Sequence, residues 1–292
     1  MTSEQTATNR GTAPMTGQEP GQSIAGYLWV PLLVLIAAYL PALIDLVADW
    51  YHDDNYSHGF LIPLVSGYLL WRKRDQLSAV PKTIDNRGLG VVVVGMIMFV
   101  LANGAAEYFV LRLSFVVTLF GLVWYLMGPQ IVRFTLFEIA LLLFMIPIPY
   151  VIYYSATFPM QLLTSKITVF ALNLLGAGAV RQGNIIILAG QSLEVAEACS
   201  GIRSLMSLLA LGFIWAHLSQ SRFAAKAILF LSVIPIAVVA NSARVLVTSV
   251  LAYAATPEVT NEPWHSLMGL VTFAVAIFML LILSAILRRV WP

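Results

Sequence analysis

Long apolar runs dominate the chain after residue 26, and short polar segments separate them. Several runs reach the ~17–25 residues that a helix needs to cross a bilayer. They predict about eight membrane-spanning helices, at residues 27–48, 58–71, 89–106, 113–128, 134–152, 200–218, 227–253 and 266–287. The second run is short and suits a tilted or re-entrant segment. The pattern therefore predicts an all-α polytopic membrane protein.

Composition supports this class. The chain is 60% hydrophobic and 10% charged, with a mean hydropathy of +0.86, whereas an average soluble protein carries about a quarter charged residues. Residues 1–26 contain almost no large apolar side chains and predict a disordered cytoplasmic tail. The first apolar run lacks an Ala-x-Ala-type cleavage site, so we expect a retained helix. Residues 27–292 then form a single transmembrane domain.

The charges between the predicted spans indicate the orientation. Alternate loops carry the basic residues Arg72, Lys73, Arg74, Lys82, Arg87, Arg133, Arg222, Lys226, Arg288 and Arg289. The opposite loops carry Asp49, Asp53, Asp54, Glu107, Glu194, Glu197, Glu258 and Glu262. The positive-inside rule makes the basic loops cytoplasmic. We therefore expect both termini inside and the acidic loops on the outer face.

Residues 153–198 do not form a plain span. The apolar stretch 164–179 is interrupted by Lys166, Asn173 and glycines, which indicates an interfacial helix on the outer face. Residues 181–197 contain the run Asn184-Ile185-Ile186-Ile187-Leu188 and then a Gly190-Gln191 turn signal, which resembles a small β-hairpin. Because open strand edges are not tolerated in lipid, this hairpin should lie outside the bilayer or be buried in protein. It leads directly to Cys199.

Cys199 is the only cysteine of the chain and opens the sixth span at its outer end. A lone cysteine in an apolar protein is more often an inert small hydrophobe. Here Ser200 can cap the helix, and the backbone N–H groups and helix dipole favour a thiolate. Position therefore makes Cys199 a candidate nucleophile.

Two further polar groups should reach the same depth. Arg244 lies 18 residues after the cytoplasmic Lys226, or about 27 Å along a helix. Asn241 shares its helix face. His265 stands at the outer start of the last span, where Glu262 could orient its ring. Arg244 could instead extend its guanidinium to the lipid head groups, and His265 could be an ordinary polar residue at the water–lipid boundary.

Together these groups are complete for acyl transfer. A cysteine nucleophile needs a proton acceptor or an imidazolium partner, and the tetrahedral oxyanion needs a cationic donor. Cys199, His265 and Arg244 supply one candidate for each role. Arg203, four residues after Cys199, is a rival donor on the same helix face.

The segment Glu197-Ala198-Cys199-Ser200-Gly201-Ile202-Arg203, followed by Asn241-x-x-Arg244 and His265, resembles the exosortase/archaeosortase family of integral membrane cysteine transpeptidases. Tyr56-Ser57-His58-Gly59 also resembles a family motif, although no chemical step follows for His58. The resemblance covers the chain after residue 26, and the length is similar to the short exosortase B kind. It implies Cys199 as nucleophile, Arg244 as transition-state cation and His265 as acid/base or thiolate partner.

The resemblance also implies the partners and the compartment. Substrates would be exported proteins with a C-terminal Pro-Glu-Pro-type sorting signal (PEP-CTERM), one transmembrane helix and a basic tail. The enzyme would lie in the cell inner membrane with its active site outside, without cofactor, metal or nucleic acid. The acyl-enzyme could be resolved by water or by an amine.

The sequence leaves several alternatives open. Glu194 and Glu197 could pair with Arg203 or Arg244, bind a cation or face water, and we favour the pairing. His52, Asp53, Asp54 and His58 lack a compact metal-ligand spacing and suit an ordinary polar loop. A transporter or a scaffold of an export assembly without thiol chemistry is the competing functional class.

Overall fold

The structure is a computed structural model, and it describes residues 29–188, 191–195, 202–254 and 264–291. The predicted tail, residues 1–26, lies outside these ranges. The first half contains α2 (Trp29–His52), the 3-10 helix η1 (Ser57–Phe60), α3 (Leu61–Arg72), α4 (Arg74–Ala79), α5 (Asn86–Gly104), α6 (Tyr108–Leu141) and the 3-10 helix η2 (Leu142–Met145).

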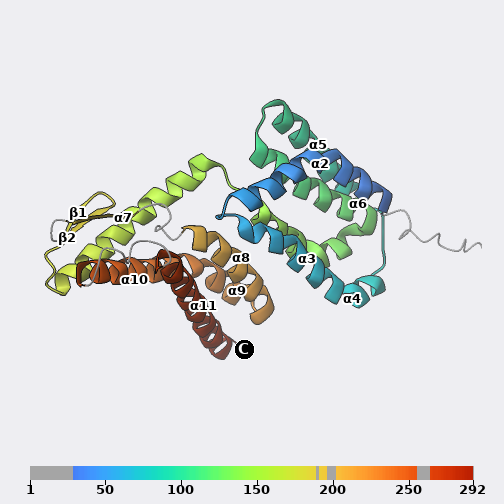
Figure 1. Cartoon of the computed structure of the whole chain (residues 1–292). Helices are drawn as coiled ribbons and strands as arrows, with labels where there is room; N and C mark the ends of the chain where they lie inside the picture. The colour runs from blue at the N-terminus through green and yellow to red at the C-terminus, as the bar shows by residue number, and fades with distance from the viewer. Residues whose placement is uncertain (1–28, 189–190, 196–201, 255–263, 292) are drawn as a thin grey trace, which may run out of the picture.

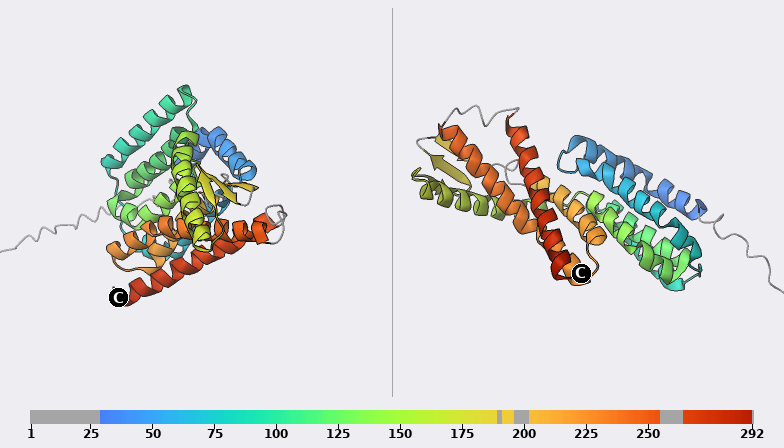
Figure 2. Two further views of the ribbon diagram at one scale, coloured as in Figure 1. Left: turned by 90° about the vertical axis from the view of Figure 1, so that its left-hand side faces the viewer. Right: turned by 90° about the horizontal axis from the view of Figure 1, so that it is seen from below.

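The second half begins at a proline-containing connection after η2. It contains α7 (Tyr150–Leu174), strands β1 (Val180–Gln182), β2 (Ile185–Leu188) and β3 (Gln191–Glu194), then α8 (Ile202–Ser219), α9 (Phe223–Leu231), α10 (Val233–Ala254) and α11 (Trp264–Val290). Helices α2 to α6 gather at one end of the molecule, and α7, α10 and the strands at the other (Figure 1). The view from below in Figure 2 shows the same elongated arrangement.

Helix α8 connects the two halves. Its residues Leu205 and Leu208 belong to a buried cluster with α9, α10 and α11. Ala210 belongs to a second buried cluster, built from α2, α3, α6 and η2. The helix that follows Cys199 therefore packs against both ends of the molecule.

Among the described residues, five helical segments are long and apolar enough to span a membrane. The all-α polytopic class is thus supported, while the predicted number of about eight spans stays a prediction. Helix α3 has only 12 residues and is not one of the five. Helix α8 is not one of the five either. Its apolar part, Leu205–Ser219, is shorter than the five spanning segments.

One of the five segments, Tyr108–Met145, is 38 residues long and bends back on itself. Gly128 inside it has a φ of 86°, and Pro129 follows, so the helix cannot continue straight. Arg112 contacts Asp49 at 2.6 Å, and the carbonyl of Met145 accepts from Trp50 at 2.8 Å. A straight helix would separate Arg112 and Met145 by about 50 Å. The two arms therefore lie side by side and correspond to the predicted runs 113–128 and 134–152.

The second arm ends earlier than expected. The prediction of helix through residue 152 is wrong, because Pro147 and Pro149 interrupt it and residues 146–149 are not helical. Helix α7 then begins at Tyr150, well before the interfacial helix expected at 164–179. It ends at Leu174, where the positive φ of 79° at Gly176 turns the chain.

The segment expected to form a β-hairpin does contain antiparallel strands. They number three, in the order β1-β2-β3, because Val180–Gln182 adds a strand before the expected start. Gly183, with a φ of 64°, makes the turn between β1 and β2. Ile186 is fully buried and packs in a cluster with Leu172 of α7. Protein therefore covers one face of the sheet.

Helices α5 and α6 pack through glycines. A Cβ on Gly88 would stand 2.2 Å from the backbone N of Tyr125, and one on Gly95 would stand 2.3 Å from the hydroxyl of Thr118. Small residues at such contacts allow close approach of two apolar helices. In Figure 1, α5 lies at the upper edge of the molecule and α6 lies among α2, α3 and α5.

Candidate functional site

The predicted site residues fall into three groups. Cys199, Glu197 and Glu262 lie outside the described residues. Arg203 and His265 are placed on α8 and α11, where the structure describes their helical backbone. The side chains of His58, Glu194, Asn241 and Arg244 are described and can be located.

Arg244 contacts the helix that carries His265. Atoms of its guanidinium lie 3.9 Å from the position that a Cβ on Gly269 would take. Gly269 is four residues after His265, so the two positions share a face of α11. The face that carries His265 is therefore turned toward Arg244. Asn241, one turn earlier on α10, is only 2% exposed.

Glu194 lies at the end of β3, where Asn184 holds the strand. The Asn184 side-chain amide donates to Glu194 Oε1 at 3.4 Å and to Gln161 Oε1 of α7 at 3.3 Å. The backbone N of Val195 donates to the Asn184 carbonyl at 3.0 Å. These bonds fix the chain four residues before Cys199. The favoured pairing of Glu194 with an arginine is not seen among the described side chains.

His58 connects the first predicted outer loop to α8. Its Nε2 lies 3.2 Å from the carbonyl of Phe144 and its Nδ1 lies 3.4 Å from Ser207 Oγ. A carbonyl can only accept, so Nε2 carries the proton and Nδ1 accepts from the hydroxyl. Burial lowers the pKa of His58, and the hydrogen bond to Phe144 opposes this effect. Ser207 shares a helix face with Arg203, four residues earlier.

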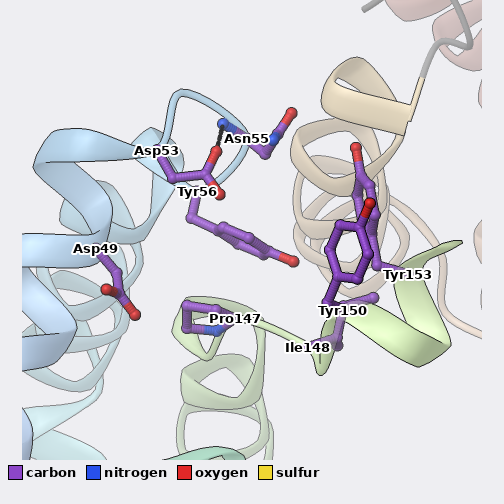
Figure 3. Close-up of a pocket in the computed structure, with 8 residues that line it drawn as sticks. All are labelled: Asp49, Asp53, Asn55, Tyr56, Pro147, Ile148, Tyr150 and Tyr153. Atoms are coloured by element: carbon purple, nitrogen blue, oxygen red, sulfur yellow. Dashed lines mark hydrogen bonds between the residues drawn. The ribbon is translucent and has the colours of Figure 1, made fainter. Parts of the chain in front are cut away.

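A cavity of about 290 Å³ opens next to this loop. It lies between the end of α2, the turn before η1 and the start of α7 (Figure 3). The described residues that line it are Asp49, Asp53, Asn55, Tyr56, Pro147, Ile148, Tyr150 and Tyr153. Burial raises the pKa of Tyr56 to about 12, so its hydroxyl stays protonated.

The cavity lies close to the start of α8. Tyr153, which is 7% exposed, belongs to the buried cluster that contains Leu205, six residues after Cys199. His58, two residues after Tyr56, contacts Ser207 on the same helix. Sequence reasoning missed both tyrosines: it assigned Tyr150 to the span 134–152 and Tyr153 to the irregular segment 153–198. The Pro147 and Pro149 pair was the signal that could have placed them at a helix start.

Comparison with known families supplies one match. The sequence model of the transmembrane exosortase family matches residues 50–282, which is most of the chain. Neither the curated proteins nor the solved structures give a match. The matched range contains every residue that the sequence proposed for the site.

Proposed function

This chain belongs to the transmembrane exosortase family, and from that premise we propose that it cleaves C-terminal sorting signals through a thioester on Cys199. The substrates are exported proteins with a Pro-Glu-Pro-type motif, a transmembrane helix and a basic tail. The family supports a membrane transpeptidase broadly. The contact of Arg244 with the His265 face of α11 is the observation that most favours the specific residues.

The proposed acylation uses three side chains. The Cys199 thiolate attacks the carbonyl carbon of the scissile peptide, and Arg244 stabilises the oxyanion that forms. As the C–N bond breaks, the His265 imidazolium gives its proton to the leaving amine. A thioester and a neutral imidazole remain. Asn241 supports Arg244 from the preceding turn of α10, and Arg203 assists in substrate binding.

Replacement of the sulfur tests this proposal. Cys199→Ala and Cys199→Ser should insert into the membrane at the level of the unmodified protein while substrate processing stops. Mass spectrometry of the substrate's new C-terminus measures the processing. Normal processing by the alanine variant would exclude a cysteine enzyme and favour the transporter or scaffold alternative.

We place the site on the outer side of the inner membrane, from the alternation of basic and acidic loops. A membrane-impermeant thiol reagent added to intact cells should label Cys199, the only cysteine of the chain. Cys199→Ser is the matched control, because it has no thiol that the reagent could label. Labelling that requires access to the cytoplasmic face would reverse the orientation.

A further inference from the structure

The cavity beside η1 combines negative charge with aromatic rings. Asp49 and Asp53 lie on its α2 side and the rings of Tyr150 and Tyr153 on its α7 side, with the Tyr56 hydroxyl directed between them (Figure 3). None of the described lining residues is basic. Arg112 pairs with Asp49 at 2.6 Å but does not line the cavity, so Asp53 leaves an excess of negative charge.

This lining selects a cationic group. An ammonium is attracted both by the carboxylates and by the faces of tyrosine rings. The Tyr56 hydroxyl stays protonated and neutral, because burial raises its pKa to about 12. A carboxylate-bearing ligand would be repelled. Among the described residues no group of three His, Cys, Asp or Glu side chains could hold a metal ion, so an organic cation fits better.

We propose that this cavity binds the primary ammonium of the acceptor that resolves the acyl-enzyme. The inference rests on the proposed function and makes the reaction a transpeptidation. Its support is the place of the cavity: Tyr153 reaches the cluster of Leu205, and the loop that carries Tyr56 contacts α8 through His58. Helix α8 begins at Ile202, three residues after Cys199 in the sequence.

The proposed transfer starts from the acylated enzyme. The bound ammonium gives one proton to the Asp53 carboxylate, and the nitrogen lone pair then attacks the thioester carbonyl. The C–N bond forms and the C–S bond breaks, and the sulfur leaves with the electron pair as thiolate. The second nitrogen proton goes to the neutral His265, which restores the thiolate–imidazolium pair. Asp53 releases its proton to water.

Asp53 is the residue to change, because Asp49 holds Arg112. Ethylamine, a cation at neutral pH, and hydroxylamine, an uncharged nucleophile, serve as acceptors with a sorting-signal peptide. We expect Asp53→Asn to lower the ratio of ethylamine to hydroxylamine product about tenfold. Asp54→Asn, an exposed neighbour that does not line the cavity, is the matched control. Mass spectrometry distinguishes the two products.

The outcomes separate the two proposals. An unchanged ratio in Asp53→Asn, with hydroxylamine product still formed, overturns the ammonium site and leaves the thioester intact. Absence of hydroxylamine product in the unmodified enzyme overturns the thioester and the inference that rests on it. Tyr150→Leu provides a second variant at an exposed position of α7 and should lower the same ratio several-fold.

Discussion

The guanidinium of Arg244 lies against Gly269 of the last helix, 3.9 Å from where a Cβ would stand. This distance is an ordinary van der Waals contact, so a methyl group fits and a larger side chain does not. Gly269 lies one helical turn after His265. The contact therefore joins α10 to α11 one helical turn from position 265, whereas the sequence could place Arg244 and His265 only at a common depth.

The effect of a substitution at Gly269 on activity should depend on the size of the new side chain. We expect Gly269→Ala to keep substrate cleavage near the unmodified rate. Gly269→Leu should lower it about 10²-fold, because a shift of about 1 Å in a catalytic group has that effect. Gly90→Leu, at a helical glycine with nothing within 4 Å of its Cβ position, is the control. Equal cleavage rates for both leucine variants would remove Gly269 from the site.

A second prediction distinguishes the two arginines. Arg244→Ala should lower the acylation rate by about 10²–10³, as loss of one oxyanion donor does. Arg244→Lys should recover little, because a point charge lacks the planar fork of donors. Arg203→Ala should mainly raise the substrate concentration needed for half-maximal rate. Single-turnover acylation that survives Arg244→Ala but not Arg203→Ala would exchange these roles.

The sequence predicted the depth of the candidate groups but not the rotation of the helices that carry them. Distance along an apolar run predicts how far Arg244 lies from Lys226, in a loop predicted to be cytoplasmic. It does not say which neighbour the arginine meets, since that depends on tertiary packing. The contact with Gly269 is therefore new information, and the side chains of Cys199 and His265 lie outside what the structure describes.

The cavity could not be predicted from the sequence either, because it too depends on tertiary packing. Its lining comes from three separate segments, at the end of α2, before η1 and at the start of α7. Tyr150 looked like the end of a membrane span, because hydropathy averages over Pro147 and Pro149. The reversal at Gly128 was easier to predict, because Arg133 already indicated a basic loop between two spans.

His58 provides a prediction about pH. Its pKa is lowered in the fold, so the neutral ring stabilises the native state above the ordinary value of 6.5, and this contribution is lost as the pH falls through the lowered pKa. Between about pH 7.5 and about pH 5, the thermal unfolding midpoint should fall further for the unmodified protein than for His58→Gln. His52→Gln, at the exposed end of α2, should behave like the unmodified protein. Identical pH dependence for both variants would contradict this role of His58.

The last prediction concerns the ion pair that joins Lys73, directly after α3, to the second arm of α6. Lys73 Nζ lies 2.7 Å from Glu138 Oε1, and the Glu138 side chain is completely buried. Lys73→Met leaves that carboxylate without its charge partner and should destabilise the protein by about 3–5 kcal/mol. Lys73→Met with Glu138→Leu should recover most of the loss, because no buried charge remains.

Arg74→Met is the matched control for this change. Its pairing with Asp75, at 3.7 Å, joins two exposed side chains and should contribute at most about 1 kcal/mol. Thermal unfolding in detergent measures the four proteins side by side. If Lys73→Met unfolds at the same temperature as Arg74→Met, Glu138 does not depend on Lys73, and the junction between α3 and α6 must be held by the apolar contacts and by the bond from Ser66 to the Glu138 carbonyl.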